Sequence, residues 1–178
     1  TGENRYRQVA TETLDYILRD MTAPEGGFYS ATDADSEGVE GKFFVWTPEQ
    51  IREILTNEQD ATRFCAYYDI TDEGNWEHTN IQRKKKSLET VAEEIGCSPG
   101  DLRESIMRAR RTVYQARLKR IPPGLDDKII TAWNGMMIGT MAEAGRVFNH
   151  QPYLDGAIRA ADFLLTTLSR PESRLWRT

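Results

Sequence analysis

The segment 33–40 (DADSEGVE) concentrates the side chains of this chain that are best suited to chemistry. It carries four carboxylates, which belong to Asp33, Asp35, Glu37 and Glu40. Clustered carboxylates repel one another, so burying them requires a compensating cation. Three functions fit this pattern: metal binding, acid–base work on a substrate, and simple solvation of an exposed loop.

The spacing of these carboxylates matches only the first half of an EF-hand calcium loop. Asp33, Asp35 and Glu37 take positions one, three and five, and Gly38 takes position six. Position twelve, where such loops place a bidentate glutamate, is occupied by Phe44. The flanking segments are predicted strands rather than helices. We therefore expect no metal site in the acidic segment.

A second group of polar residues begins the segment 126–148, which is predicted to be one helix. This helix is apolar nearly all round and is therefore expected to be buried on most sides. Asp127, Thr131 and Asn134 follow at i, i+4 and i+7, which makes a polar stripe on the first two turns. Polar groups on a buried helix must be paired or must line a wet cavity. The pattern favours a cavity for Asn134, whereas Asp126 or Asp127 could serve only as a helix cap.

Two further side chains of this segment could contact a ligand. Trp133 lies off the polar stripe. It could pack in the core, or its ring could stack on a ligand. Lys128 could neutralise the acidic segment or extend along the surface with its charge in water. Together with the stripe, they complete a candidate substrate-binding set.

The elements that must position these groups are mostly helical. Apolar periodicity and capping residues predict helices at about 3–20, after Thr47, after Asn57, after Ser87, after Ser98, and at about 126–148 and 152–169. Aromatic and β-branched runs predict one β-hairpin, with strands at about 27–32 and 42–46. We therefore predict a mainly α domain over 1–178, with a β-hairpin insertion at about 26–46 and a linker at about 121–125.

An internal repeat organises the chain. A shift of 147 positions superposes the segment 14–30 (LDYILRDMTAPEGGFYS) on the segment 161–177 (ADFLLTTLSRPESRLWR). Tyr6 then coincides with Tyr153, and Pro24-Glu25 coincides with Pro171-Glu172. The repeated unit is a helix, a Pro-Glu turn and a short strand. Such units cannot bury their apolar faces alone, so they are expected to stack in a solenoid or a closed ring.

The repeat also predicts where the acidic segment lies. Helices at 126–148 and 152–169, joined by a tight turn, are antiparallel, so the start of the first lies beside the end of the second. The equivalent rim of the other repeat bears the acidic segment. Asp33 or Asp35 should therefore share a cleft with Asp127 and the polar stripe.

Composition limits the functional classes further. The net charge of −5 argues against an extended nucleic-acid surface, although one predicted helix and the run 83–86 are basic. Cys65 and Cys97 form no CxxC motif and lack partners for a zinc site. No signal peptide or apolar run of transmembrane length occurs. A cytoplasmic protein without a membrane partner is expected, and both ends of the chain fall within predicted elements, as in a piece of a longer protein.

Three stretches resemble a known family: GGFYSATDADSEGVEGKFFVWTPEQI, GNWEHTNI and PPGLDDKIITAWNGMMI. The chain is similar over nearly its whole length to the family typified by spermatogenesis-associated protein 20. The resemblance implies an N-terminal thioredoxin-like domain elsewhere in the protein. It also implies an (α/α)6 toroid like that of six-hairpin glycosidases and N-acylglucosamine 2-epimerases, of which this chain would be the first part.

The resemblance implies that a cavity of the toroid is faced by six residues: Asp33, Asp35, Asp127, Lys128, Trp133 and Asn134. We expect a carbohydrate-active domain of the glycoside hydrolase or sugar epimerase type, with Asp33, Asp35 and Asp127 catalytic and no cofactor. Lys128, Thr131, Trp133 and Asn134 would bind the sugar. The alternative is a non-catalytic toroid that binds a glycan or a protein partner beside the thioredoxin-like domain.

The incomplete calcium loop gives a first prediction. Because Phe44 replaces the bidentate glutamate, titration calorimetry should detect no calcium binding at 33–37 at physiological calcium concentrations. Micromolar binding that Asp35→Asn abolishes would contradict this expectation.

Overall fold

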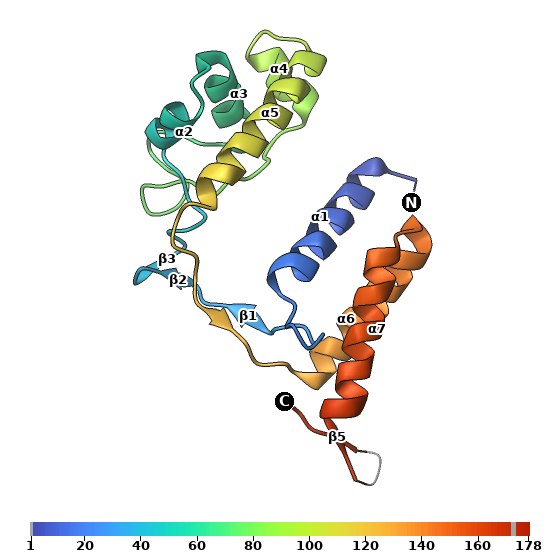
Figure 1. The fold of residues 1–178 in the computed structure, drawn as a ribbon. Helices are drawn as coiled ribbons and strands as arrows, with labels where there is room; N and C mark the ends of the chain where they lie inside the picture. The colour runs from blue at the N-terminus through green and yellow to red at the C-terminus, as the bar shows by residue number, and fades with distance from the viewer. Residues whose placement is uncertain (1, 172–173) are drawn as a thin grey trace. The chain divides into compact units, whose positions relative to one another are not determined.

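The computed structural model describes residues 2–171 and 174–178, and these residues are mainly α-helical (Figure 1). The helices are α1 (Asn4–Asp20), α2 (Pro48–Ile54), α3 (Glu58–Tyr68), α4 (Leu88–Glu94), α5 (Pro99–Arg117), α6 (Thr131–Phe148) and α7 (Gln151–Thr167). The strands are β1 (Ala31–Thr32), β2 (Asp35–Ser36), β3 (Val39–Glu40), β4 (Leu125–Asp126), β5 (Ser169–Arg170) and β6 (Arg174–Leu175). The mainly α class predicted from the sequence is confirmed.

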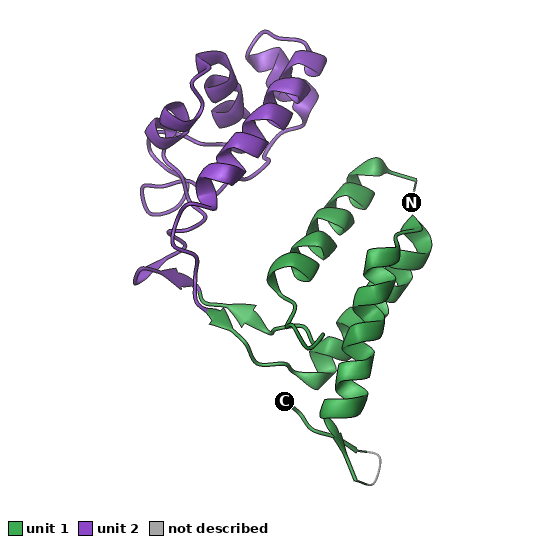
Figure 2. Cartoon of the chain, viewed as in Figure 1, with its two compact units in different colours: residues 1–33, 125–178 green, residues 34–124 purple. Residues whose placement is uncertain are grey.

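The chain forms two compact units (Figure 2). Unit 1 comprises Thr1–Asp33 and Leu125–Thr178, and unit 2 comprises Ala34–Gly124. Unit 2 is therefore inserted into the sequence of unit 1. The chain leaves unit 1 after β1 and returns to it at β4, next to the predicted linker.

Side-chain caps start the helices of unit 2 where the sequence predicts them. Thr47 and Gln50 form a reciprocal capping box at α2, since each side chain bonds to the backbone of the other. Asn57, Ser87 and Ser98 cap α3, α4 and α5 through the backbone N–H three residues later. Each cap satisfies a donor that the first helical turn leaves without an intrahelical partner.

Helices α2 to α5 enclose the hydrophobic core of unit 2. Ile51, Phe64 and Leu102 are fully buried in it, and Trp46 packs at its edge with 2 % exposure. The backbone of Trp46 exchanges two hydrogen bonds with Asn80, which is itself fully buried. The Asn80 side chain also accepts from the Thr71 N–H and donates to the Thr71 carbonyl. The Asn80 carboxamide therefore links the backbone at Trp46 to the backbone at Thr71, which share no sheet.

A charged cluster ties α3 to α5 inside unit 2. Asp60 accepts hydrogen bonds from the Ser105 hydroxyl at 2.5 Å and from the Arg108 guanidinium at 2.9 Å. Burial would raise the pKa of Asp60, but these hydrogen bonds and the charges of Arg108 and Arg63 outweigh it and hold the pKa below its usual value. Arg108, one of the basic residues of α5, thus forms an ion pair inside unit 2.

Two more basic residues near the end of α5 pack against the segment 43–46. Arg120 donates to the carbonyl oxygens of Lys42, Phe43 and Val45, and its guanidinium lies 3.5 Å from the ring centroid of Trp46. Arg117 lies over the ring of Phe43 at 5.5 Å. These contacts hold the aromatic segment in an irregular conformation.

Unit 1 is built on three helices, with α7 beside both α1 and α6 (Figure 1). Its core contains Leu14, Phe28, Met141 and Tyr153. Helices α6 and α7 can approach closely at Gly145 because glycine has no Cβ. A Cβ added there would lie only 2.6 Å from a carbon of Leu154. A larger residue at that position would force the two helices apart.

The internal repeat is visible in the hydrogen bonds of unit 1. After α1, Thr22 bridges Phe28, and the Tyr29 N–H donates to the Met21 carbonyl. After α7, Ser169 pairs with Leu175, and the Trp176 N–H donates to the Leu168 carbonyl. Each partner is displaced by the same 147 positions. The predicted repeat of a helix, a turn and a returning strand is therefore confirmed, while Glu172 of the predicted Pro-Glu turn lies outside the described residues.

The predicted pairing of 27–32 with 42–46 is wrong. Strand β1 pairs instead with β4, through the antiparallel partners Ala31–Asp126 and Thr32–Leu125. A smaller hairpin joins β2 to β3 through Glu37 and Gly38, both at positive φ. The nine residues between the two predicted strands thus contain a hairpin of their own, closed by a two-residue turn. The 42–46 segment forms no strand; it contacts Arg117 and Arg120, and its last residue, Trp46, makes an isolated bridge with Asn80.

The Asp60 cluster predicts a stability that depends on pH. A folded-state pKa below the unfolded value of about 3.9 contributes stability above that value and loses it as the pH falls through the folded pKa. Asp60→Asn should therefore lower the urea midpoint at pH 7, and its difference from wild type should shrink below about pH 4. The control is Asp101→Asn, an exposed carboxylate in the first turn of α5. An Asp60 effect that is equal at pH 7 and pH 3 would contradict the assignment.

Candidate functional site

Asn134 is buried and hydrogen-bonds to backbone groups; it does not line a cavity in the described residues. Its side chain is 1 % exposed, and it lies in the first turn of α6. The carboxamide oxygen accepts from the Phe28 N–H at 2.7 Å, and the carboxamide nitrogen donates to the Phe28 carbonyl at 2.9 Å. The same nitrogen donates to the Ile130 carbonyl at 3.1 Å. The amide therefore pairs with an extended segment as a neighbouring strand would.

Thr131 makes the matching contact to the second repeat. Its N–H donates to the Arg177 carbonyl, and its hydroxyl donates to the Trp176 carbonyl at 2.6 Å. The start of α6 thus holds the returning segments of both repeats, one through Asn134 and the other through Thr131. Both polar side chains therefore form hydrogen bonds with backbone groups of unit 1.

The predicted polar stripe does not exist as a helix face. Helix α6 begins at Thr131, five residues later than expected, and the preceding residue Ile130 has an extended backbone. Asp127 therefore lies outside the helix, exposed, and is not aligned with Thr131 and Asn134. The error arose because an apolar run without a capping side chain gives no signal for the first helical residue.

Helix α6 is also less buried than its composition predicts. Trp133 is 52 % exposed and Met136 is 66 % exposed, whereas Met141 and Gly145 on the opposite side are buried against α7. The apolar residues around α6 therefore form two faces, of which only one is covered in the described residues. An exposed tryptophan is free to stack on a ligand.

The paired strands β1 and β4 gather polar side chains from distant parts of unit 1. The hydroxyl of Ser30 donates to the Asp126 carbonyl at 3.2 Å. The carboxylate of Asp126 pairs with the Lys128 ammonium at 2.7 Å. The hydrogen bond from Lys128 lowers the pKa of Asp126, and a weaker one from Ser30 acts in the same direction. Sequence reasoning singled out Asp127 here and treated Asp126 only as a cap.

The register of the two strands relates Asp33 to the two aspartates of the other strand. Asp126 lies opposite Ala31, and Asp33 follows two residues later in the chain. Strand β1 ends at Thr32 and β4 ends at Asp126, so Asp33 and Asp127 each directly follow the last paired residue of their strand. Asp126 is therefore the carboxylate that belongs to the ladder itself, and Asp33 and Asp127 adjoin it in the chain.

The rest of the acidic segment belongs to unit 2. Asp35 lies in β2 and is exposed, and Ser36 donates through its hydroxyl to the Ile121 carbonyl at 2.5 Å. Glu37, in the turn, pairs with Lys42 at 2.9 Å. The expected cleft between the acidic segment and the start of α6 stays a prediction.

The described residues show neither a metal-binding cluster nor a helix of membrane-spanning character. Within residues 2–171 and 174–178, no three His, Cys, Asp or Glu side chains gather as a metal site would require. None of the helices in those ranges combines the length and the hydropathy of a transmembrane segment. Cys65 and Cys97 are free and half-buried, and burial raises the pKa of the Cys65 thiol to about 11.

Comparison with curated proteins identifies relatives over most of the chain. Human (Homo sapiens) spermatogenesis-associated protein 20 is 29 % identical over 188 residues, which cover 92 % of this chain and 24 % of that protein. The mouse (Mus musculus) protein of the same name is 27 % identical over the same shares. An uncharacterized protein of Caenorhabditis elegans is 30 % identical over 180 residues, which cover 89 % of this chain and 25 % of that protein.

The chain is similar over about nine tenths of its length to the mammalian proteins named spermatogenesis-associated protein 20, which supports the family resemblance of its motifs. It spans about a quarter of the length of the curated relatives it matches. No family profile matches the chain. The described residues of this chain provide the paired strands β1 and β4, the Asp126–Lys128 ion pair, and the start of α6 with Thr131, Asn134 and the exposed Trp133.

The role of Asn134 predicts a large loss of stability on substitution. Asn134→Ala should destabilise unit 1 by about 2–4 kcal/mol, because the Phe28 N–H and carbonyl would be left buried without partners. Asn134→Asp should be at least as damaging at pH 7, since a carboxylate would face the carbonyls of Phe28 and Ile130. Hydrogen exchange of peptides that cover the Phe28 amide measures the effect within unit 1.

The control for this experiment is Asn4→Ala at the exposed first residue of α1, which should leave the protection of the Phe28 amide unchanged. Unchanged protection in both Asn134 variants would show that the amide does not hold the returning segment.

Proposed function

We propose that this chain is part of an (α/α) toroid in a longer protein and that the strands β1 and β4 present a sugar-binding surface. The observation that carries the proposal is the Asp126–Lys128 ion pair at the paired strands, followed in the chain by the start of α6 with the exposed Trp133. Carboxylates accept hydrogen bonds from hydroxyl groups, and an indole ring offers an apolar face for stacking. Asp33, Asp126 and Asp127 supply the acceptors.

The charge state of Asp126 favours binding over catalysis. A glycosidase needs one carboxylic acid whose pKa is raised, so that it can protonate the leaving group. Lys128 does the opposite at Asp126, because its hydrogen bond holds the pKa of this carboxyl below the usual value. Asp126 is therefore suited to accept hydrogen bonds from a sugar, or to act as a base, but not to serve as the acid.

A catalytic function is the second candidate, because Asp126 lies in β4 and Asp33 directly follows β1. An inverting glycosidase would need the carboxyl groups of such a pair about 6.5–9.5 Å apart. In that case Asp126 would activate water and Asp33 would be the acid. Asp35 and Asp127, named from the sequence with Asp33, remain candidates for the same chemistry.

Epimerase chemistry has less support in this chain. Such an enzyme uses a base that titrates near neutral pH, most often a histidine. His150 lies at the turn between α6 and α7, and α6 with its 18 residues is about 27 Å long. His150 is therefore at the far end of the helix from Thr131 and the paired strands. The other histidine, His78, belongs to unit 2 and not to the unit that contains the paired strands.

The alternative of a non-catalytic toroid beside a thioredoxin-like domain is a variant of the same proposal. The surface would then recognise a glycan, or a glycan on a protein partner, and the attached domain would supply any redox chemistry. The described residues contain no CxxC motif of their own.

A binding and turnover experiment separates these functions. The longer natural protein is titrated with a panel of free aldoses and aryl glycosides, and both heat of binding and product formation are measured. Trp133→Ala should weaken sugar binding at least tenfold, while Asp126→Asn and Asp127→Asn identify the acceptor that the sugar uses. The control is Met107→Ala, which removes an exposed apolar side chain from α5 of unit 2 and should leave sugar binding unchanged.

The outcomes are distinct. Binding without turnover supports the binding function. Turnover that Asp33→Asn or Asp126→Asn lowers by about 10²–10⁴-fold supports the catalytic one. Failure to bind any sugar, or binding that is unaffected in all of these variants, rejects the proposed surface.

A further inference from the structure

The β5–β6 hairpin, which follows α7, carries two arginines directly opposite each other (Figure 1). Arg170 and Arg174 are antiparallel register partners, and both side chains are exposed. Residues paired in this way have Cβ atoms about 4.5–5.5 Å apart, and like charges at such positions destabilise the pairing. Among residues 2–171 and 174–178, no ion pair joins either arginine to a carboxylate. The hairpin therefore holds two guanidinium groups close together at a cost in stability.

The internal repeat shows that the fold does not need these arginines. The equivalent positions after α1, 147 residues earlier, are Ala23 and Gly27. The Ala23 N–H donates to the Gly27 carbonyl, inside the loop that the bridge between Thr22 and Phe28 closes. A returning segment of this kind thus forms with small, uncharged residues at both positions. The arginines of the second repeat add positive charge to a shape that the first repeat builds without it.

An exposed tryptophan lies beside the arginine pair. The guanidinium carbon of Arg170 is 4.0 Å from the ring centroid of Trp176, whose side chain is 50 % exposed. Stacking on an aromatic face restricts the planar guanidinium, which then loses less freedom when it binds an acid. The Trp176 carbonyl accepts from the Thr131 hydroxyl, which anchors the hairpin to the start of α6. The arginine pair is therefore fixed to the segment that carries Lys128 and Trp133.

We infer that the β5–β6 hairpin makes the proposed surface selective for anionic sugars, with Arg170 and Arg174 binding the acidic group and Trp176 positioning Arg170. This inference rests on the proposed sugar-binding function and names its substrate class, a sugar that bears a carboxylate or a phosphate. A guanidinium presents paired N–H donors that match the oxygens of both acids. An anion between the two arginines would also offset the repulsion that their register imposes.

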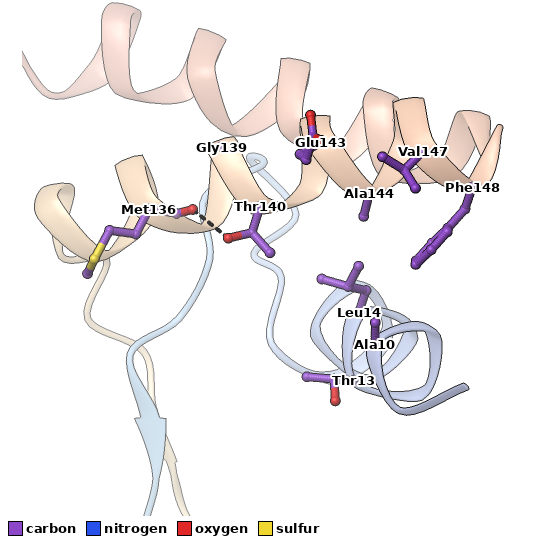
Figure 3. Close-up of a pocket in the computed structure, with 10 residues that line it drawn as sticks. All are labelled: Ala10, Thr13, Leu14, Met136, Gly139, Thr140, Glu143, Ala144, Val147 and Phe148. Carbon is purple, nitrogen blue, oxygen red and sulfur yellow. Dashed lines mark hydrogen bonds between the residues drawn. The ribbon is translucent and has the colours of Figure 1, made fainter. Parts of the chain in front are cut away.

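The groove between α1 and α6 is a poor site for such a ligand (Figure 3). Its volume is about 770 Å³, and the described residues that line it are mostly apolar or small. The charged residue among them is Glu143, which pairs with Arg146 at 2.7 Å. The hydroxyl of Thr140 donates to the Met136 carbonyl of the same helix. An acidic sugar would lose its hydration in this groove without gaining a cationic partner from its lining.

Titration calorimetry with the longer natural protein tests this inference. At low ionic strength, glucuronate or glucose 6-phosphate should bind at least about tenfold more tightly than glucose, and added salt should reduce the difference. The acid that shows the preference identifies the group that the hairpin binds. Arg170→Gln and Arg174→Gln should each remove most of the preference without changing the affinity for glucose.

The matched control is Arg5→Gln at the start of α1. It removes an exposed arginine that also lies over an aromatic ring, that of Tyr6, but Arg5 has no arginine register partner in a strand. It should leave the affinities for glucose and for the acidic sugars unchanged.

Arg174→Glu separates binding from folding. It places a carboxylate opposite Arg170, and opposite charges stabilise a cross-strand pair. The variant should therefore abolish the preference for acidic sugars, while the Trp176 amide, which donates to the Leu168 carbonyl, should exchange no faster than in the wild type. Arginines that acted only in folding would leave the sugar preference unchanged.

The outcomes distinguish this inference from the function on which it rests. Equal affinities for glucose and the acidic sugars would leave the sugar-binding surface intact and overturn the inference. Absence of binding to any sugar would overturn both. If acetate or inorganic phosphate binds as tightly as the sugar that carries the same acidic group, the hairpin selects anions rather than sugars, and the inference fails. An unchanged preference in all variants of Arg170 and Arg174 would also overturn it.

Discussion

The paired hydrogen bonds between Asn134 and the backbone of Phe28 are the interaction on which unit 1 depends. Phe28 is part of the core and lies in a segment that belongs to no extended sheet, so its N–H and carbonyl need partners away from water. The carboxamide supplies one acceptor and one donor in the geometry of a neighbouring strand. Thr131, about one turn earlier on the same helix, holds the second repeat by donating its hydroxyl to the Trp176 carbonyl and its N–H to the Arg177 carbonyl. The start of α6 therefore fixes both returning segments.

Unit 2 uses the same solution independently. Asn80 is fully buried and bonds with the backbone of Trp46 and Thr71, which lie in loops. In both units a buried asparagine stands beside a buried aromatic residue on an irregular segment. An amide is suited to this task because it donates and accepts at once without carrying a charge that would resist burial. A mainly α protein with only two-residue strands can thereby satisfy its extended backbone.

The pairing of β1 with β4 connects the fold to its proposed function. It closes unit 1 at the point where unit 2 is inserted, and it places Asp126 in a short ladder, with Asp33 directly after β1. Ordering an exposed charged surface has an entropic cost, which the core and the Asn134 contacts of unit 1 offset. The ion pair of Asp126 with Lys128 then keeps the carboxylate in the form that accepts hydrogen bonds.

The sequence by itself determined the features that depend on neighbouring residues. The caps at Thr47, Asn57, Ser87 and Ser98 were predictable because a capping side chain bonds only three residues ahead. The mainly α class and the repeat were predictable for a similar reason, since apolar periodicity reports the buried face of a helix directly. The family resemblance, carried by specific motifs, was confirmed by the relatives.

Tertiary structure alone decided the features that depend on distant partners. Adjacent aromatic runs predict a hairpin for β1, yet its partner β4 lies more than ninety residues away. The sequence predicts a cavity role for Asn134, because nothing local reveals that the Phe28 backbone bonds to it. Trp133 could be core or surface until the second face of α6 proved uncovered. The physical reason is the same in each case: hydrogen-bond satisfaction and burial are set by what lies opposite in space, which local sequence patterns do not record.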